Sequence, residues 1–165
     1  MTPGSLRIRL ADSAQDCDTA RSLFLEYATW LGIDLCFQGF NDELANLPGD
    51  YARPAGRLFL ADAGAGSEAG GCVALRRLGS DPSGRACELK RLWVRPAFRG
   101  HDAGRALTEA ALAAAREIGY KTIKLDTIPA IMPHAVGLYR SLGFTDCAPY
   151  YRSNIPDSLY MERAL

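Results

Sequence analysis

The chain has 165 residues, 48% of them hydrophobic and 23% charged, which is the composition of a single globular domain spanning residues 1–165. Its 19 Lys and Arg balance its 19 Asp and Glu, and a net charge of zero argues against general binding to nucleic acid or to an anionic membrane. Five widely spaced cysteines without a C-x-x-C pair predict neither a disulfide framework nor a metal site, and the N-terminus has no apolar run typical of a signal peptide, so we expect a cytoplasmic protein.

The first half of the chain predicts a strand, two helices and two further strands, over residues 6–11, 13–32, 41–47, 57–62 and 71–78. The first segment alternates apolar and basic side chains, which is the period of a strand. Ser13 and Asp16 have the spacing of a capping box, and Gly32 is a suitable stop for the helix that they begin. The two later strands flank a turn rich in Gly and Ala, so we expect a hairpin.

The second half predicts a strand, a helix, a strand, a helix and two closing strands, over residues 86–94, 104–119, 121–127, 133–144, 145–153 and 158–165. The first helix is rich in alanine and ends at Gly119. The second has Pro133 in its first turn, where the missing N–H costs no helical hydrogen bond. This order predicts an α/β protein, with a mixed sheet and helices on both of its faces.

The loop FRGHDAGRAL, Phe98 to Leu107, lies between a predicted strand and the alanine-rich helix. Free N–H groups and the helix dipole at such a helix start attract anions, and glycine lets the backbone approach a ligand closely. The loop matches neither G-x-x-x-x-G-K-[ST] nor G-x-G-x-x-G, so a nucleoside triphosphate is not favoured. Taken alone, the pattern predicts either an anion site or a plain turn.

The flanking segments decide between these alternatives. ELKRLWVRPAFRGHDAGRAL, followed by LDT and then by HAVGLYRSLGF, resembles the GCN5-related N-acetyltransferase (GNAT) superfamily. Members carry a [QR]-x-x-G-x-[GA] loop after the fourth strand and a [LY]-Y-x-x-x-G-F pattern in the last helix. The resemblance covers residues 86–152, and the first 85 residues match only in their order of elements. It implies the acyl-CoA N-acyltransferase fold, a splayed mixed sheet flanked by helices, with acetyl-CoA as co-substrate.

The resemblance also implies a set of coenzyme-binding residues. Around the pyrophosphate of acetyl-CoA would lie Arg99, Gly100, His101, Asp102, Ala103 and Gly104, with Arg105 opening the helix. Backbone groups for the pantetheine arm and the thioester carbonyl would come from Leu92, Trp93 and Val94.

Two residues depart from the family pattern. Met132 stands seven residues before Tyr139, where the family often has asparagine, and Asp102 stands where it usually has glycine. Aspartate tolerates left-handed backbone and can cap a helix, so we expect Asp102 to be the cap, with its oxygen aimed away from the ligand. The basic neighbours expected to offset its charge are Arg95, Arg99, His101 and Arg105.

Two residues are candidates for proton transfer. Glu88 stands four residues before Leu92, where many family members carry a glutamate base, and strand alternation places Glu88, Lys90, Leu92 and Val94 on one face. Four strand residues span roughly 13 Å, so Glu88 would act through water unless a bulge re-aims it. The alternative is a surface carboxylate paired with Lys90 or Arg91. Tyr139 would be the acid that protonates the departing thiolate, and the alternative is a core aromatic.

The predicted acceptor pocket is aromatic and partly polar, and its candidate residues are Phe37, Gln38, Phe40, Tyr150 and Tyr151. The alternative is that most of these pack in the core. We expect an acetyl-CoA-dependent N-acetyltransferase that acts on a primary amine of a small molecule or peptide, without nucleic-acid or membrane partners. A homodimer and a non-catalytic acyl-CoA-binding or sensing module stay open. A hydrolase is disfavoured because no G-x-S-x-G elbow is present.

Overall fold

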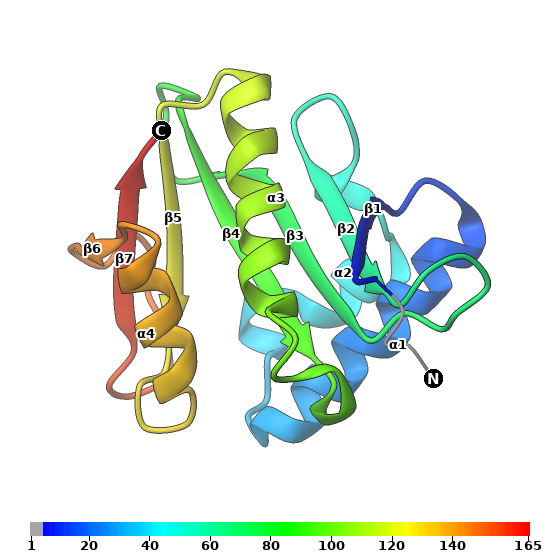
Figure 1. Cartoon of the computed structure of the whole chain (residues 1–165). Coiled ribbons are helices and arrows are strands. Elements are labelled where there is room, and N and C mark those ends of the chain that lie inside the picture. Colours follow the sequence, from blue (N-terminus) through cyan, green and yellow to red (C-terminus); the bar gives the residue numbers. More distant parts are fainter. Residues whose placement is uncertain (1–4) are drawn as a thin grey trace.

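The computed structural model describes residues 5–165, which form a 7-stranded sheet of order β1-β2-β3-β4-β5-β7-β6 (Figure 1). The strands are β1 Arg7–Leu10, β2 Arg57–Asp62, β3 Gly71–Arg77, β4 Ala86–Val94, β5 Thr122–Thr127, β6 Thr145–Asp146 and β7 Leu159–Ala164. Neighbouring strands are antiparallel except β4 and β5, which run parallel. The helices are α1 Ala14–Leu31, α2 Phe40–Ala45, α3 Ala103–Ile118 and α4 Pro133–Ser141, with single 3₁₀ turns η1 Cys36–Gln38, η2 Gly49–Tyr51 and η3 Pro96–Phe98. The predicted order of helices and strands is confirmed.

Helices cover both faces of the sheet, as the sequence predicts (Figure 1). On one face, α3 packs over β2, β3 and β4 around Leu107 and Ala111, and α4 adds Tyr139 to the same core. On the other face, α1 contributes Leu23 and Phe24 to a second core with the opposite side chains of β2 and β3. The mixed sheet is therefore a central layer with an apolar core on each side.

Local signals set the helix ends. The Ser13–Asp16 capping box is formed, and Gly32 and Gly119 adopt the left-handed conformation that ends α1 and α3. The predicted strand over 145–153 is wrong beyond Asp146. The hydrogen bond of Cys147 N–H to Tyr160 C=O is followed by an irregular segment that contains Pro149, which has no N–H to donate.

The sheet splays open between β4 and β5. Their parallel pairing covers only Ala86–Glu88 against Thr122–Lys124, after which the strands separate toward their carboxyl ends (Figure 1). This leaves the edge of β4 from residue 89 onward facing the gap rather than a neighbouring strand. No helix among residues 5–165 has the length and apolarity needed to cross a membrane.

A β-bulge at Arg91 lies on β4 beside this gap. Arg91 has φ 59°, and the β3–β4 register shifts between Cys72 and Ala74. The extra residue reverses the alternation of side chains, because two residues now stand opposite one. As a result Leu92 and Val94 pack against the core under α3, whereas Glu88 and Lys90 lie on the opposite face. The prediction of one shared face for these four residues is therefore wrong.

A buried ion pair holds the bulge in place. Arg91 Nε and Nη2 donate to the two carboxylate oxygens of Glu43 at 2.9 and 3.1 Å, and its Nη1 donates to Gln38 Oε1 at 3.0 Å. The guanidinium also lies over the Phe40 ring, 5.0 Å from its centroid. These contacts from η1 and α2 offset the strain of a left-handed arginine.

Candidate active site

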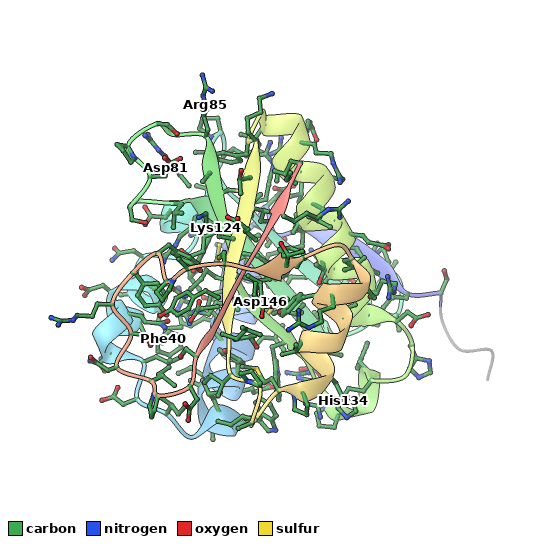
Figure 2. The ribbon with its side chains drawn as sticks, turned by 90° about the vertical axis from the view of Figure 1, so that its left-hand side faces the viewer. Phe40, Asp81, Arg85, Lys124, His134 and Asp146 are labelled. Atoms are coloured by element: carbon green, nitrogen blue, oxygen red, sulfur yellow. The ribbon has the colours of Figure 1, made fainter. Side chains whose placement is uncertain are left out.

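A groove of about 630 Å³, which we call the long groove, follows the open edge of β4. Its floor is Leu92, Trp93 and Val94, and its walls come from the loop before α3 and from the start of α4. Both helices begin at this end of the molecule, and His134 marks the start of α4 in Figure 2. The groove therefore receives two helix N-termini and one strand edge with free backbone groups.

The start of α3 supplies donors for an anion. The first helical hydrogen bond runs from Ala106 N–H to Asp102 C=O, so the N–H groups of Ala103, Gly104 and Arg105 have no helical partner. Gly100 has φ 84°, with open space where a Cβ would stand, so the backbone is unshielded there. Such a helix start can hold a phosphate group.

Asp102 occupies the N-cap position with φ 57° and ψ 18°, so the expected left-handed conformation is confirmed. Its side chain makes no capping hydrogen bond, so the predicted capping role is wrong. The physical reason is that the cap side chain normally reaches the helix from an extended backbone, whereas here the backbone is left-handed. Asp102 lines the long groove.

The residues predicted to bind coenzyme A fall into two groups, those that line the long groove and those that lie outside it. Those that line the long groove are Leu92, Trp93, Val94, Arg99, Gly100, Asp102, Ala103 and Gly104. His101 and Arg105 lie outside the lining; the Arg105 guanidinium donates to Ser141 Oγ at 2.7 Å. Arg95 is paired with Glu26 and Glu68, at 2.7 and 2.9 Å. Of the four basic side chains expected to offset Asp102, Arg99 alone lines the groove in the described part of the chain.

Arg99 is held against the indole rings of the groove. Its guanidinium lies 5.2 Å from the ring centroid of Trp93 and 5.7 Å from that of Trp30, and its Nε donates to Val94 C=O at 3.1 Å. Trp30 and Tyr27 from α1 complete this wall. The groove thus combines aromatic surface with one oriented cation.

A cavity of about 40 Å³, the middle cavity, lies in the gap between β4 and β5. It shares Tyr27, Leu92 and Met132 with the long groove. Tyr139 of α4 lines it, and burial raises the pKa of the Tyr139 hydroxyl, which therefore keeps its proton at neutral pH. The ring also packs against Phe144, with centroids 5.6 Å apart, so the core role exists beside the cavity-lining one.

Two polar residues at the end of β5 also line the middle cavity. Asp126 Oδ2 accepts a 2.6 Å hydrogen bond from Tyr151 Oη, and its Oδ1 lies 3.5 Å from Lys90 Nζ. The Thr127 hydroxyl is buried and has no hydrogen-bond partner among the residues that the structure describes. An unpaired buried hydroxyl costs stability, so this position favours a polar ligand group or a water molecule in the cavity.

Beyond Lys90 lies a cavity of about 240 Å³, the side pocket, which contains Glu88. Glu88 is buried; its Oε2 accepts from Arg76 Nε at 3.1 Å, and its Oε1 accepts from Tyr150 Oη at 3.2 Å. Lys90 Nζ lies 3.5 Å from Glu88 Oε1. The alternative of a surface carboxylate paired with Lys90 or Arg91 is therefore wrong in its exposure and right in the pairing with Lys90, whereas Arg91 pairs with Glu43.

The predicted acceptor residues gather partly as expected. Gln38, Tyr150 and Tyr151 line the side pocket, and Gln38 Nε2 donates to Tyr151 Oη at 3.2 Å. Phe40 is buried at the start of α2, outside this lining, so core packing describes it. The side chain of Phe37 lies outside the described part of the structure.

The three cavities adjoin in the order long groove, middle cavity, side pocket. Gln38 and Lys90 line both the middle cavity and the side pocket, as Tyr27 and Leu92 line both the groove and the middle cavity. Residues from α1, β4, β5 and α4 thus line the middle cavity, which lies between the long groove and the side pocket in the splayed sheet. Tyr139 and Asp126 both belong to the lining of this middle cavity.

Sequence reasoning missed Arg76, Asp126 and Thr127. For Arg76 and Asp126 the sequence carried a signal, because charged residues inside otherwise buried strands are rare unless they are paired or functional. Arg76 lies directly opposite Glu88 in the β3–β4 ladder, a proximity that depends on strand register.

Residues 19–144 match the model of the "Acetyltransferase (GNAT) family". The chain therefore belongs to the GNAT family, and it is an N-acetyltransferase. An uncharacterised N-acetyltransferase of Schizosaccharomyces pombe is 38% identical over 161 residues, which cover 98% of this chain and 96% of that protein. The IAA acetyltransferase of Azospirillum brasilense is 34% identical over 116 residues, which cover 69% of this chain and 71% of that protein.

Solved structures give the same fold. A GNAT acetyltransferase from Staphylococcus aureus superposes with a TM-score of 0.77 at 19% identity, over 97% of this chain and 99% of the other. A nourseothricin acetyltransferase superposes with a TM-score of 0.55 at 31% identity, over 67% of this chain and 66% of the other. The splayed mixed sheet is thus the GNAT acyltransferase architecture.

Proposed function

We propose that the protein transfers the acetyl group of acetyl-CoA to a primary amine of a small molecule or peptide. The observation that carries this proposal is that the long groove and the side pocket adjoin the same middle cavity, whose lining includes Tyr139. Two substrates that enter from separate openings can meet there, away from bulk water.

The long groove fits an acyl-CoA in size and in donor chemistry. The free N–H groups at residues 103–105 suit the pyrophosphate, and the unpaired edge of β4 at Leu92, Trp93 and Val94 suits the amides of the pantetheine arm. The partnerless Thr127 hydroxyl adds a polar position in the middle cavity. When bound, acetyl-CoA supplies an acetyl group activated as a thioester.

Glu88 is the proposed base. An amine must lose its proton before it attacks, and the Glu88 carboxylate lines the pocket in which that amine would lie. Lys90 and Gln38 stand between Glu88 and the middle cavity, so the proton would reach Glu88 through water or through the Tyr150 hydroxyl. Asp126 is a second carboxylate, nearer the meeting point, and is the comparison residue for any test of Glu88.

Tyr139 is the proposed acid. In the overall reaction a C–N bond forms, a C–S bond breaks, and the departing sulfur gains a proton. The Tyr139 hydroxyl carries its proton at neutral pH, and burial raises its pKa further, which weakens it as an acid until charge develops on the departing sulfur. Tyr139 belongs to the lining of the cavity where the two substrates would meet.

Coenzyme binding is tested first by thermal unfolding. Acetyl-CoA at a hundred times its dissociation constant should stabilise the fold by about 2.7 kcal/mol. ATP is the control ligand, since it carries phosphates without the pantetheine arm. A melting temperature unmoved by millimolar acetyl-CoA would contradict the proposal.

Turnover is tested by release of free coenzyme A over a panel of primary amines. Release that depends on the amine supports acetyl transfer. Tight acetyl-CoA binding without release for any amine would instead support the non-catalytic acyl-CoA-binding module.

A further inference from the structure

The charged groups of the side pocket are already paired with one another. Its charged lining residues are Arg76, Lys90 and Glu88, and Asp126 of the middle cavity lies 3.5 Å from Lys90. Lys124, labelled in Figure 2, is 5.8 Å from the Tyr150 ring centroid, but it pairs with Glu162 at 3.2 Å and lies outside the lining. Glu88 is paired with both Arg76 and Lys90, so an acceptor with several ammonium groups would find no unpaired carboxylate among the described lining residues.

The two cations contact the same carboxylate, Glu88, but differ in exposure. The Lys90 side chain is 5% exposed and stands at the inner end, where Gln38 and Lys90 also line the middle cavity. The Arg76 side chain is 24% exposed and lies with Gly79 and Ser80 of the β3–β4 turn, which are exposed and form the outer rim. The inner cation is balanced on both sides, since Lys90 Nζ is 3.5 Å from Glu88 Oε1 and 3.5 Å from Asp126 Oδ1.

Arg76, the outer cation, has hydrogen-bond donors that no other residue of 5–165 uses. Within residues 5–165, the Arg76 guanidinium makes one hydrogen bond, from Nε to Glu88 Oε2, and lies 6.0 Å from the Tyr51 ring centroid, so neither Nη group has a hydrogen-bond partner there. A guanidinium fork of this kind matches the two oxygens of a carboxylate.

The size of the pocket limits the acceptor further. About 240 Å³ is below the range of roughly 300–1,000 Å³ typical of sites for drug-sized ligands. The pocket therefore suits a single small molecule rather than a large antibiotic.

We propose that the acceptor is a small amine that also carries a carboxylate, an amino-acid-like compound. The carboxylate binds the free Nη groups of Arg76 at the outer rim, and the amine points past Lys90 toward Asp126 and the middle cavity. This inference rests on the proposed acetyl transfer and names the substrate class of the same site.

The experiment compares matched amines by kcat/KM with acetyl-CoA. The carboxylated probes are glycine, β-alanine and γ-aminobutyrate, which vary the spacing between the amine and the carboxylate. Each is paired with its primary amide, and putrescine and spermidine represent polycations. We expect at least one carboxylated amine to exceed its amide by about tenfold or more, since a hydrogen bond to a charged group is lost in the amide.

Variants of Arg76 test whether the preference for a carboxylated amine over its amide depends on this residue. Arg76→Gln should reduce the acid-to-amide ratio to near one, and Arg76→Lys should retain part of it. Arg77→Gln is the matched control, because Arg77 follows on the same strand, is exposed and lies outside the pocket lining. The ratio is the readout because a structural defect lowers both rates and leaves the ratio unchanged.

The outcomes separate this inference from the proposed function. If amides or polyamines are acetylated as fast as the carboxylated amines, or if the ratio persists in Arg76→Gln, the carboxylate site is wrong while acetyl transfer stands. If no amine is acetylated and acetyl-CoA leaves the melting temperature unmoved, both fail.

Discussion

The long groove and the side pocket differ in how they are built. The groove presents backbone groups, glycine and aromatic surface, and most of its lining comes from two stretches of chain, 92–104 and 131–138. The side pocket presents charged side chains from β3 and β4 and uncharged polar side chains from η1 and the loop before β7. The groove should therefore tolerate side-chain changes, whereas the side pocket should lose function when one charge is removed. The following predictions test that difference, from the largest expected effect to the smallest.

The buried Arg91–Glu43 pair lies at the bulge where β4 changes from one region to the other. Glu43→Ala leaves the Arg91 charge buried without its partner, and we expect a loss of about 3 kcal/mol or more in the free energy of unfolding. Denaturant unfolding measures this. Glu68→Ala is the control, because the Glu68 side chain is 78% exposed in its pair with Arg95 and should cost less than about 1 kcal/mol. Equal losses of stability for the two variants would mean that the Arg91–Glu43 pair contributes no more than an exposed ion pair.

Glu88→Gln keeps the shape of the side chain and removes its basicity. We expect kcat to fall by roughly a hundredfold or more at neutral pH. The loss should shrink as the pH rises, because more of the amine is then already neutral. A pH–rate profile measures this, with Asp126→Asn as the matched variant. If the pH-dependent loss belongs to Asp126→Asn, the base is Asp126; a uniform loss in Glu88→Gln at every pH indicates positioning.

Tyr139→Phe removes one hydroxyl from the middle cavity. Thiolate is a fair leaving group, so we expect a fall in the single-turnover rate of roughly tenfold to a hundredfold, with coenzyme binding almost unchanged. Tyr120→Phe is the control, since the Tyr120 hydroxyl donates to Ala55 C=O at 2.7 Å and lies in none of the three cavities. That variant should lose about 1 kcal/mol of stability and no activity. Parental turnover in Tyr139→Phe would assign Tyr139 to the core alone.

Asp102→Gly tests the tolerance of the long groove. A carboxylate about 4 Å from a phosphate charge costs about 1 kcal/mol at water-like screening, so the variant should bind coenzyme A unchanged or up to about fivefold tighter. Titration calorimetry measures this affinity. Asp157→Gly is the control, because Asp157 is also left-handed, with φ 58°, and lies outside the groove. Abolished binding in a folded Asp102→Gly protein would mean that Asp102 contacts the ligand directly.

The same difference in construction explains what the sequence could predict. The loop before α3 is contiguous, and its glycines, its helix start and the later LYRSLGF pattern are local signals that indicated the family and the position of the groove. The caps at Ser13 and Gly32 are local as well, and the structure has them where the sequence predicts them. The left-handed backbone at Asp102 followed from the residue type, but the missing capping bond depended on the actual direction of the chain.

The sequence by itself determined the element order, the mixed sheet, the family and the helix start at the long groove, because each depends on residues close together in the chain. Tertiary structure alone decided the side pocket, since Gln38, Arg76, Glu88 and Tyr150 are brought together by strand register and loop placement. The tertiary structure also decided which side chains of β4 lie on each face of the sheet. The bulge occurs at an arginine, which carries no local signal for left-handed backbone, and it is held by Glu43, 48 positions away. Long-range contacts of this kind, rather than local propensity, set which side chains meet at the proposed site of reaction.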